Sequence, residues 1–66
     1  MLKVSRLKET IDGSGLKKTF IAEKLGISYQ GYLKKENGIN DFTATEISIL
    51  KDLLKLSNKE VSEIFL

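Results

Sequence analysis

Apolar residues recur at intervals of three and four along the chain, which is the spacing of one face of an α-helix. Near the N-terminus this pattern places Val4, Leu7 and Ile11 on a common face. The segment Asp12-Gly13-Ser14-Gly15 then favours a turn, because glycine is the residue that most readily ends a helix. The sequence therefore predicts a first helix that stops within this segment.

Two further helices are predicted on either side of Gly26. Apolar residues at helical spacing run from Ile21 to Leu25, and a glycine directly after them can adopt the left-handed conformation that lets the chain turn sharply. Ser28 is a natural N-cap for the next helix, because its hydroxyl can accept from a free backbone N–H of the first turn. We expect this third helix to run to about Asn37, where Asn37-Gly38 is a second stop signal.

The last two helices are indicated by capping boxes, in which Ser or Thr stands three residues before Glu. Thr43 and Glu46 form one such pair, and Ser57 and Glu60 form the other. Each pair is followed by apolar residues at helical spacing, and the chain has no proline. Five short helices with short connections predict a compact all-α bundle, a single domain over residues 1–66.

The composition narrows the classes of function. The chain is 41% hydrophobic and 30% charged, which is typical of a soluble globular domain. It contains neither cysteine nor histidine, so thiolate zinc sites and nucleophiles paired with histidine are excluded. So small a core also offers little room for a desolvated catalytic pocket. We therefore expect no enzymatic activity, no metal and no cofactor.

No stretch approaches the roughly 20 apolar residues that cross a membrane. The opening segment, MLKVSRLK, has basic residues but lacks the uninterrupted apolar run of a secretory signal. The expected location is the cytoplasm, with no membrane partner.

Charge is distributed unevenly along the chain, although the net charge is only +2. Residues 1–40 contain eight basic and four acidic side chains, which gives +4, and residues 41–66 contain three and five, which gives −2. A basic first part joined to an acidic second part suits a polyanionic ligand on one face. Scattered, solvated charges would produce the same asymmetry, so it does not identify the ligand.

The most informative segment is KTFIAEKLGISYQGYLKKENG, from Lys18 to Gly38. Two helices that cross steeply need a small residue where they touch and often a glycine in the turn between them. Ala22 stands four residues before Gly26 and supplies the small contact. This arrangement predicts a helix-turn-helix.

The chain resembles the Cro/repressor-type (XRE-like) helix-turn-helix family of phage and bacterial transcriptional regulators. The residues that carry the resemblance are Ile21-Ala22, Leu25-Gly26-Ile27-Ser28 and Glu36-Asn37-Gly38, with Leu16 ahead of the motif. It extends over about residues 4–65 and implies a fold like the DNA-binding domain of lambda repressor.

Three residues depart from the family pattern. Lys17 stands where a Ser or Thr cap is common, and Tyr32 replaces a buried Val or Ile. Lys35 occupies a usually apolar position. It either extends its charged end to solvent or indicates that the end of the third helix is rotated.

The resemblance implies a set of DNA-contacting residues, because in this motif the third helix enters the major groove. Gln30 is suited to a bidentate contact with adenine, and Tyr29 to a phosphate or a thymine methyl group. Gly31 either allows close approach to DNA or allows tight packing against the second helix. The complete set of candidates is Lys18, Thr19, Ser28, Tyr29, Gln30, Gly31, Lys34, Asn37 and Asn40.

The function expected from this resemblance is sequence-specific binding of double-stranded DNA by a Cro-like repressor of phage or prophage type that occludes a promoter. A homodimer on DNA is one expected partner arrangement, with Ile64-Phe65-Leu66 either in the monomer core or at the dimer contact. The alternative is a protein-interaction module that binds another regulator as an antirepressor.

Overall fold

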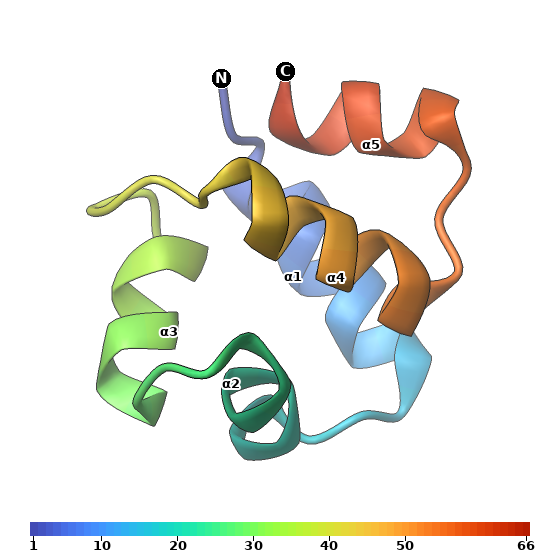
Figure 1. The fold of residues 1–66 in the computed structure, drawn as a ribbon. Helices are drawn as coiled ribbons and strands as arrows, with labels where there is room; N and C mark the ends of the chain where they lie inside the picture. The colour runs from blue at the N-terminus through green and yellow to red at the C-terminus, as the bar shows by residue number, and fades with distance from the viewer.

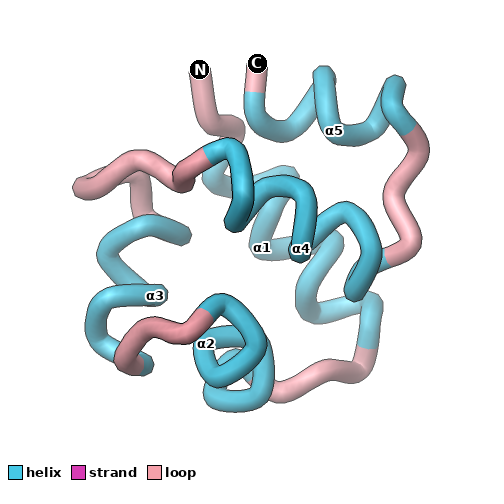
Figure 2. Tube along the Cα trace, viewed as in Figure 1, coloured by secondary structure: helices cyan, strands magenta, loops and turns pink.

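The computed structural model describes residues 1–66, and all of its regular structure is α-helical (Figures 1 and 2). The five helices are α1 (Val4–Ser14), α2 (Lys18–Leu25), α3 (Tyr29–Glu36), α4 (Ala44–Leu54) and α5 (Asn58–Phe65). The all-α character and the five helices predicted from the sequence are confirmed. None of these helices has the length and apolar character needed to cross a membrane.

The first two helices end at glycines in the left-handed conformation. Gly15 follows α1 with φ 76°, and Gly26 follows α2 with φ 73°. Helix α1 continues through Asp12 and Gly13, so the predicted stop segment ends the helix only at its last residue. A side chain at φ near +75° would be strained, which is why glycine stands at both turns.

Side chains cap the starts of the last three helices. Ser28 Oγ accepts from the Gly31 N–H at 3.0 Å at the start of α3. Both capping boxes are present, since Thr43 and Ser57 each exchange hydrogen bonds with the glutamate three residues later. Helix α2 begins after Lys17, whose side chain makes no capping hydrogen bond. These local predictions are confirmed because each depends on residues only three positions apart.

The hydrophobic core draws on every helix. Tyr32 is fully buried in it, which agrees with the core-facing position predicted for this residue. Phe42, in the segment before α4, has its ring 6.4 Å from that of Tyr32 and 5.6 Å from that of Phe65. The ten core residues are Leu7, Ile11, Ile21, Ala22, Leu25, Tyr32, Leu50, Leu56, Ile64 and Phe65.

The two termini lie side by side, where α5 returns to the start of the chain (Figure 1). The Lys3 N–H donates to the Ile64 carbonyl at 2.7 Å, and the amino group of Met1 donates to the Leu66 carbonyl at 2.7 Å. Ile64 and Phe65 belong to the monomer's own core, whereas Leu66 is 78% exposed. Of the C-terminal apolar cluster, only Leu66 is left for an outside contact.

Candidate nucleic-acid interface

A short connection joins α2 to α3. Gly26 and Ile27 both turn back onto the end of α2, donating to the carbonyls of Glu23 at 3.0 Å and Ala22 at 3.1 Å. In Figure 1, α2 is seen nearly end on while α3 runs in the plane of the picture, so the two helices cross steeply. Ala22 is 2% exposed, and its role as the small contact between the two helices stays a prediction.

Helix α3 has one buried face and one exposed face. Tyr32 and Glu36, four residues apart, face inward, while Gln30 and Lys34, also four apart, are exposed. Tyr29 at the first position is 41% exposed. The helix packs against α1 and α2 and forms an edge of the molecule (Figure 1). The structure thus brings Tyr29, Gln30 and Lys34 together on one accessible helix.

A side chain at Gly31 would meet no atom of α2. A Cβ added there would lie 3.1 Å from Ser28 Oγ and within 4 Å of no other atom outside the helix backbone and its neighbours in the chain. The interpretation that this glycine permits tight packing against the second helix is therefore wrong. Its nearest constraint is the cap of its own helix, and close approach of a ligand stays a prediction.

Lys18, at the start of α2, is not a free cation. Its Nζ lies 2.8 Å from Oε1 of Glu36, whose side chain is only 1% exposed. This hydrogen bond raises the pKa of Lys18, and the charge of Glu36 adds to the effect against an opposing contribution from burial. Thr19 beside it is exposed. A phosphate contact at Lys18 therefore stays a prediction, and it would be made by an ammonium group that already has an anionic partner.

The buried end of Glu36 lies next to Tyr32. Glu36 Oε2 and the Tyr32 hydroxyl are both buried, and neither makes a hydrogen bond. Burial, followed by the neighbouring Glu36 carboxylate, raises the pKa of Tyr32 well above its ordinary value of 10.0. Lys18 is the cation that compensates the buried Glu36 carboxylate. Lys18, Glu36 and the Tyr32 hydroxyl therefore form one polar cluster between α2 and α3.

The contacts of Lys35 show how a charged side chain is accommodated at a position that is usually apolar. Its Nζ donates to Glu46 Oε1 at 2.5 Å, and its side chain is 17% exposed. The same oxygen accepts the Thr43 N–H at 2.8 Å as part of the capping box of α4. Lys35 therefore extends its stem along the core and places its charge on α4, and α3 remains helical to Glu36.

The two candidate asparagines differ in their freedom. Asn37 Nδ2 donates to the Leu33 carbonyl at 2.8 Å, so its side chain closes the end of α3. Asn40 is exposed, its side chain makes no hydrogen bond, and its backbone N–H donates to the Lys34 carbonyl at 3.3 Å. The Asn40 side chain is thus wholly available to a ligand, whereas Asn37 keeps only its second N–H and its amide oxygen for one.

Two exposed apolar residues near this region were not among the sequence-predicted candidates. Phe20 on α2 is 38% exposed, with the Lys24 ammonium 5.3 Å from the centre of its ring. Ile39, in the segment after α3, is 71% exposed. Phe20 precedes Ile21, which is buried, and a helical wheel of α2 would have placed it on the outer face.

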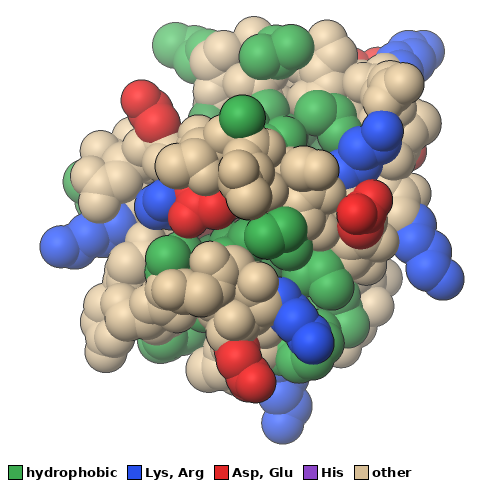
Figure 3. Space-filling model, in the orientation of Figure 1, with side chains coloured by type: hydrophobic (Ala, Val, Ile, Leu, Met, Phe, Trp, Pro, Cys, Tyr) green, Lys and Arg blue, Asp and Glu red, His purple; other side chains and the backbone are tan.

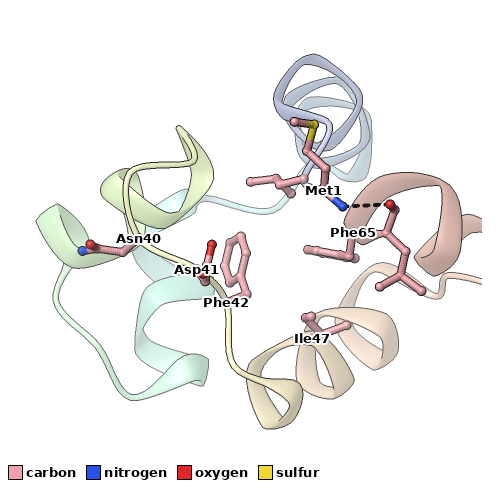
Figure 4. A pocket seen from close by; sticks show the side chains of 8 residues that line it. Met1, Asn40, Asp41, Phe42, Ile47 and Phe65 are labelled. Carbon is pink, nitrogen blue, oxygen red and sulfur yellow. Dashed lines mark hydrogen bonds between the residues drawn. The ribbon is translucent and has the colours of Figure 1, made fainter.

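A hollow of about 330 Å³ lies where the two termini meet the segment before α4 (Figure 4). Phe42, Ile47 and Phe65 form part of its wall, and Met1 and Asp41 stand at its rim (Figure 4). Its lining is mainly apolar and holds no basic side chain. The hollow is thus chemically unsuited to a polyanion, and the structure also has no cluster of acidic side chains that could hold a metal ion.

On the face shown in Figure 3, acidic side chains are mixed with the basic ones. This face therefore carries no continuous basic patch.

Searches against models of protein families, curated proteins and solved structures found no match to this chain.

Proposed function

We propose that this protein binds double-stranded DNA through α3, with α2, the turn at Gly26 and α3 acting as a helix-turn-helix. The observation that carries the proposal is the division of α3 into a buried face with Tyr32 and an exposed face with Gln30 and Lys34. A glutamine side chain can make a bidentate contact with adenine, and an exposed lysine can neutralise a phosphate. The resemblance to Cro/repressor-type regulators supports the same use of this helix.

The proposed regulatory role is repression by promoter occlusion, as in a Cro-like protein of phage or prophage type. One monomer presents one α3, which covers about one face of the major groove. Strong specific binding then requires two copies on half-sites roughly 34 Å apart. A homodimer on DNA is therefore part of the proposal.

The decisive experiment is selection of bound sequences from a random pool of DNA duplexes, followed by affinity measurements on the enriched duplex and on a shuffled copy. We expect the enriched duplex to bind at least about 10³-fold more tightly at the same salt concentration. Equal affinity for both duplexes would contradict sequence-specific binding. Absence of binding to any duplex at low salt would contradict DNA binding altogether.

The second candidate function is recognition of another regulator, as an antirepressor. The exposed apolar residues Phe20 and Ile39 favour it, because apolar side chains at a surface are a common feature of protein interfaces. Replacing both with serine should leave DNA affinity nearly unchanged if α3 binds DNA through Gln30 and Lys34. The antirepressor function is the correct one if two results are found together. The protein binds no duplex, and it binds a regulator from the same genome only when Phe20 and Ile39 are intact.

A further inference from the structure

Lys18 and Glu36 form an ion pair at the junction of α2 and α3, and their two side chains differ in how much they are exposed. The Glu36 side chain is 1% exposed and that of Lys18 is 31% exposed, a combination that none of the other three ion pairs has. An ammonium group has three N–H donors, and Lys18 Nζ uses one of them, on Glu36. Two donors are left for a ligand that approaches from solvent.

The pair also changes how Lys18 contributes to the charge of this surface. A buried carboxylate next to the ammonium makes the two groups together neutral, whereas the exposed Lys34 belongs to no ion pair. The dependence of DNA affinity on salt reports the number of phosphates that protein cations neutralise. A lysine in a neutral pair can still donate hydrogen bonds to a phosphate, but it adds little to this salt dependence.

We propose that Glu36 is a positioning residue of the DNA-binding surface, holding the Lys18 ammonium at the α2–α3 junction as a neutral pair that donates hydrogen bonds to a phosphate. This inference rests on the proposed function and assigns separate roles to two lysines. Lys18 fixes how the protein sits on the DNA backbone, and Lys34 supplies electrostatic attraction. The buried carboxylate therefore acts on DNA only through Lys18.

The test is the slope of log affinity against log salt concentration on the enriched duplex and on its shuffled copy. Glu36→Gln releases Lys18 as a free cation, so the slope should steepen by about 0.9 per bound monomer. The preference for the enriched duplex should fall, because a mobile lysine binds any phosphate. An unchanged slope and preference in this variant would overturn the proposal.

A double variant keeps the test informative if Glu36→Gln alone fails to fold. In Lys18→Met/Glu36→Gln both charges are replaced together, which leaves no uncompensated buried charge. Its slope should equal that of the wild type, whereas Lys34→Met should flatten the slope by about 0.9 per monomer. If the double variant flattens the slope as much as Lys34→Met does, Lys18 acts as a free cation and the proposal is wrong.

Glu9→Gln on α1 is the matched control, because Glu9 is exposed and forms no ion pair. This change adds the same net charge without releasing a lysine. Its slope should stay at the wild-type value, and a steepening equal to that of Glu36→Gln would assign the effect to net charge and overturn the proposal.

A measurement without DNA separates this inference from the proposed function. The pKa of the Lys18 ammonium, followed by NMR in the free protein, should lie above 10.5 in the wild type and fall in Glu36→Gln. If the pKa behaves in this way and DNA binds, but the slopes do not change, only the positioning role is refuted. If the wild type binds no duplex, the proposed function fails together with the inference.

Discussion

Lys35 on α3 and Glu46 on α4 form an ion pair of 2.5 Å, in which the glutamate oxygen also accepts the backbone N–H of Thr43. One carboxylate therefore caps a helix and ties it to the end of the helix before it. Together with the pair between Lys18 and Glu36, it holds the C-terminal end of α3 from two sides. The face of α3 that we propose to bind DNA is thus carried on a helix anchored by two partly buried ion pairs.

The pair between Lys35 and Glu46 should make stability depend on acid pH. Burial alone would raise the pKa of Glu46, but the hydrogen bonds from Lys35 and Thr43 outweigh it and lower the pKa below its ordinary value of 4.5. A lowered pKa in the folded state stabilises the protein above pH 4.5, and this contribution is lost as the pH falls from there through the folded-state pKa. We expect Glu46→Gln to be less stable than the wild type at neutral pH.

The measurement is the free energy of unfolding in denaturant at a series of pH values from neutral downward. The difference between Glu46→Gln and the wild type should shrink as the pH falls below 4.5. Glu23→Gln is the control, because Glu23 is exposed and forms no ion pair. A difference that is the same at every pH would mean that the charge of Glu46 contributes nothing to stability.

Gln30→Ala tests base recognition by α3. Loss of a bidentate contact should weaken binding to the enriched duplex by about 1–3 kcal/mol and leave binding to shuffled DNA almost unchanged. Fluorescence anisotropy on the two duplexes measures both values. Ser48→Ala on α4 is a suitable control, because Ser48 is exposed on a different helix. An equal loss on both duplexes would show that Gln30 does not read a base.

Ala22→Leu tests the packing of α2 against α3. Leucine at this buried position should overpack the contact with α3 and lower the free energy of unfolding by roughly 1–3 kcal/mol. Ala44→Leu is the matched control, because Ala44 is exposed at the first position of α4. Thermal unfolding of both variants makes the comparison. If Ala22→Leu melts with the wild type, Ala22 is not at a close helix contact and the helix-turn-helix interpretation loses its main support.

The sequence predicted the features that depend on neighbours in the chain. The cap at Ser28, the turn at Gly26 and the two capping boxes each involve residues within four positions, so side-chain chemistry and spacing suffice to find them. The pair between Lys18 and Glu36 spans 18 positions, and that between Lys35 and Glu46 spans 11. Both exist only because the helices pack in one particular way, and spacing along the chain gives no sign of them.

The same limit applies to the candidate site. Asn37 was a candidate DNA contact, but its amide donates to the Leu33 carbonyl within its own helix end. Ser28, likewise, uses its hydroxyl as an acceptor for the Gly31 N–H. Sequence reasoning identified both residues as polar and close to α3, but it could not decide whether their side chains are free for a ligand.

Gly31 and Ser28 allow the last test, because a methyl group at Gly31 would meet only the Ser28 hydroxyl, at 3.1 Å. Alanine favours a helix over glycine by about 1 kcal/mol. In a Ser28→Ala background, where this contact is absent, Gly31→Ala should therefore raise the free energy of unfolding by about that amount. In the wild-type background the gain should be smaller, since the cap must shift by a few tenths of an ångström. A full gain in both backgrounds would show that the cap tolerates the methyl group.

The same variants decide what Gly31 does in binding. If α3 approaches DNA closely at this glycine, Gly31→Ala should bind the enriched duplex more weakly even though its helix is more stable. Stability and affinity would then change in opposite directions, which damage to the fold cannot produce. Denaturant unfolding and anisotropy on the same preparation provide both values, and Gly13→Ala serves as the control, because Gly13 lies inside α1 with no atom near its added methyl group. Unchanged affinity in Gly31→Ala would mean that the DNA does not come near this position.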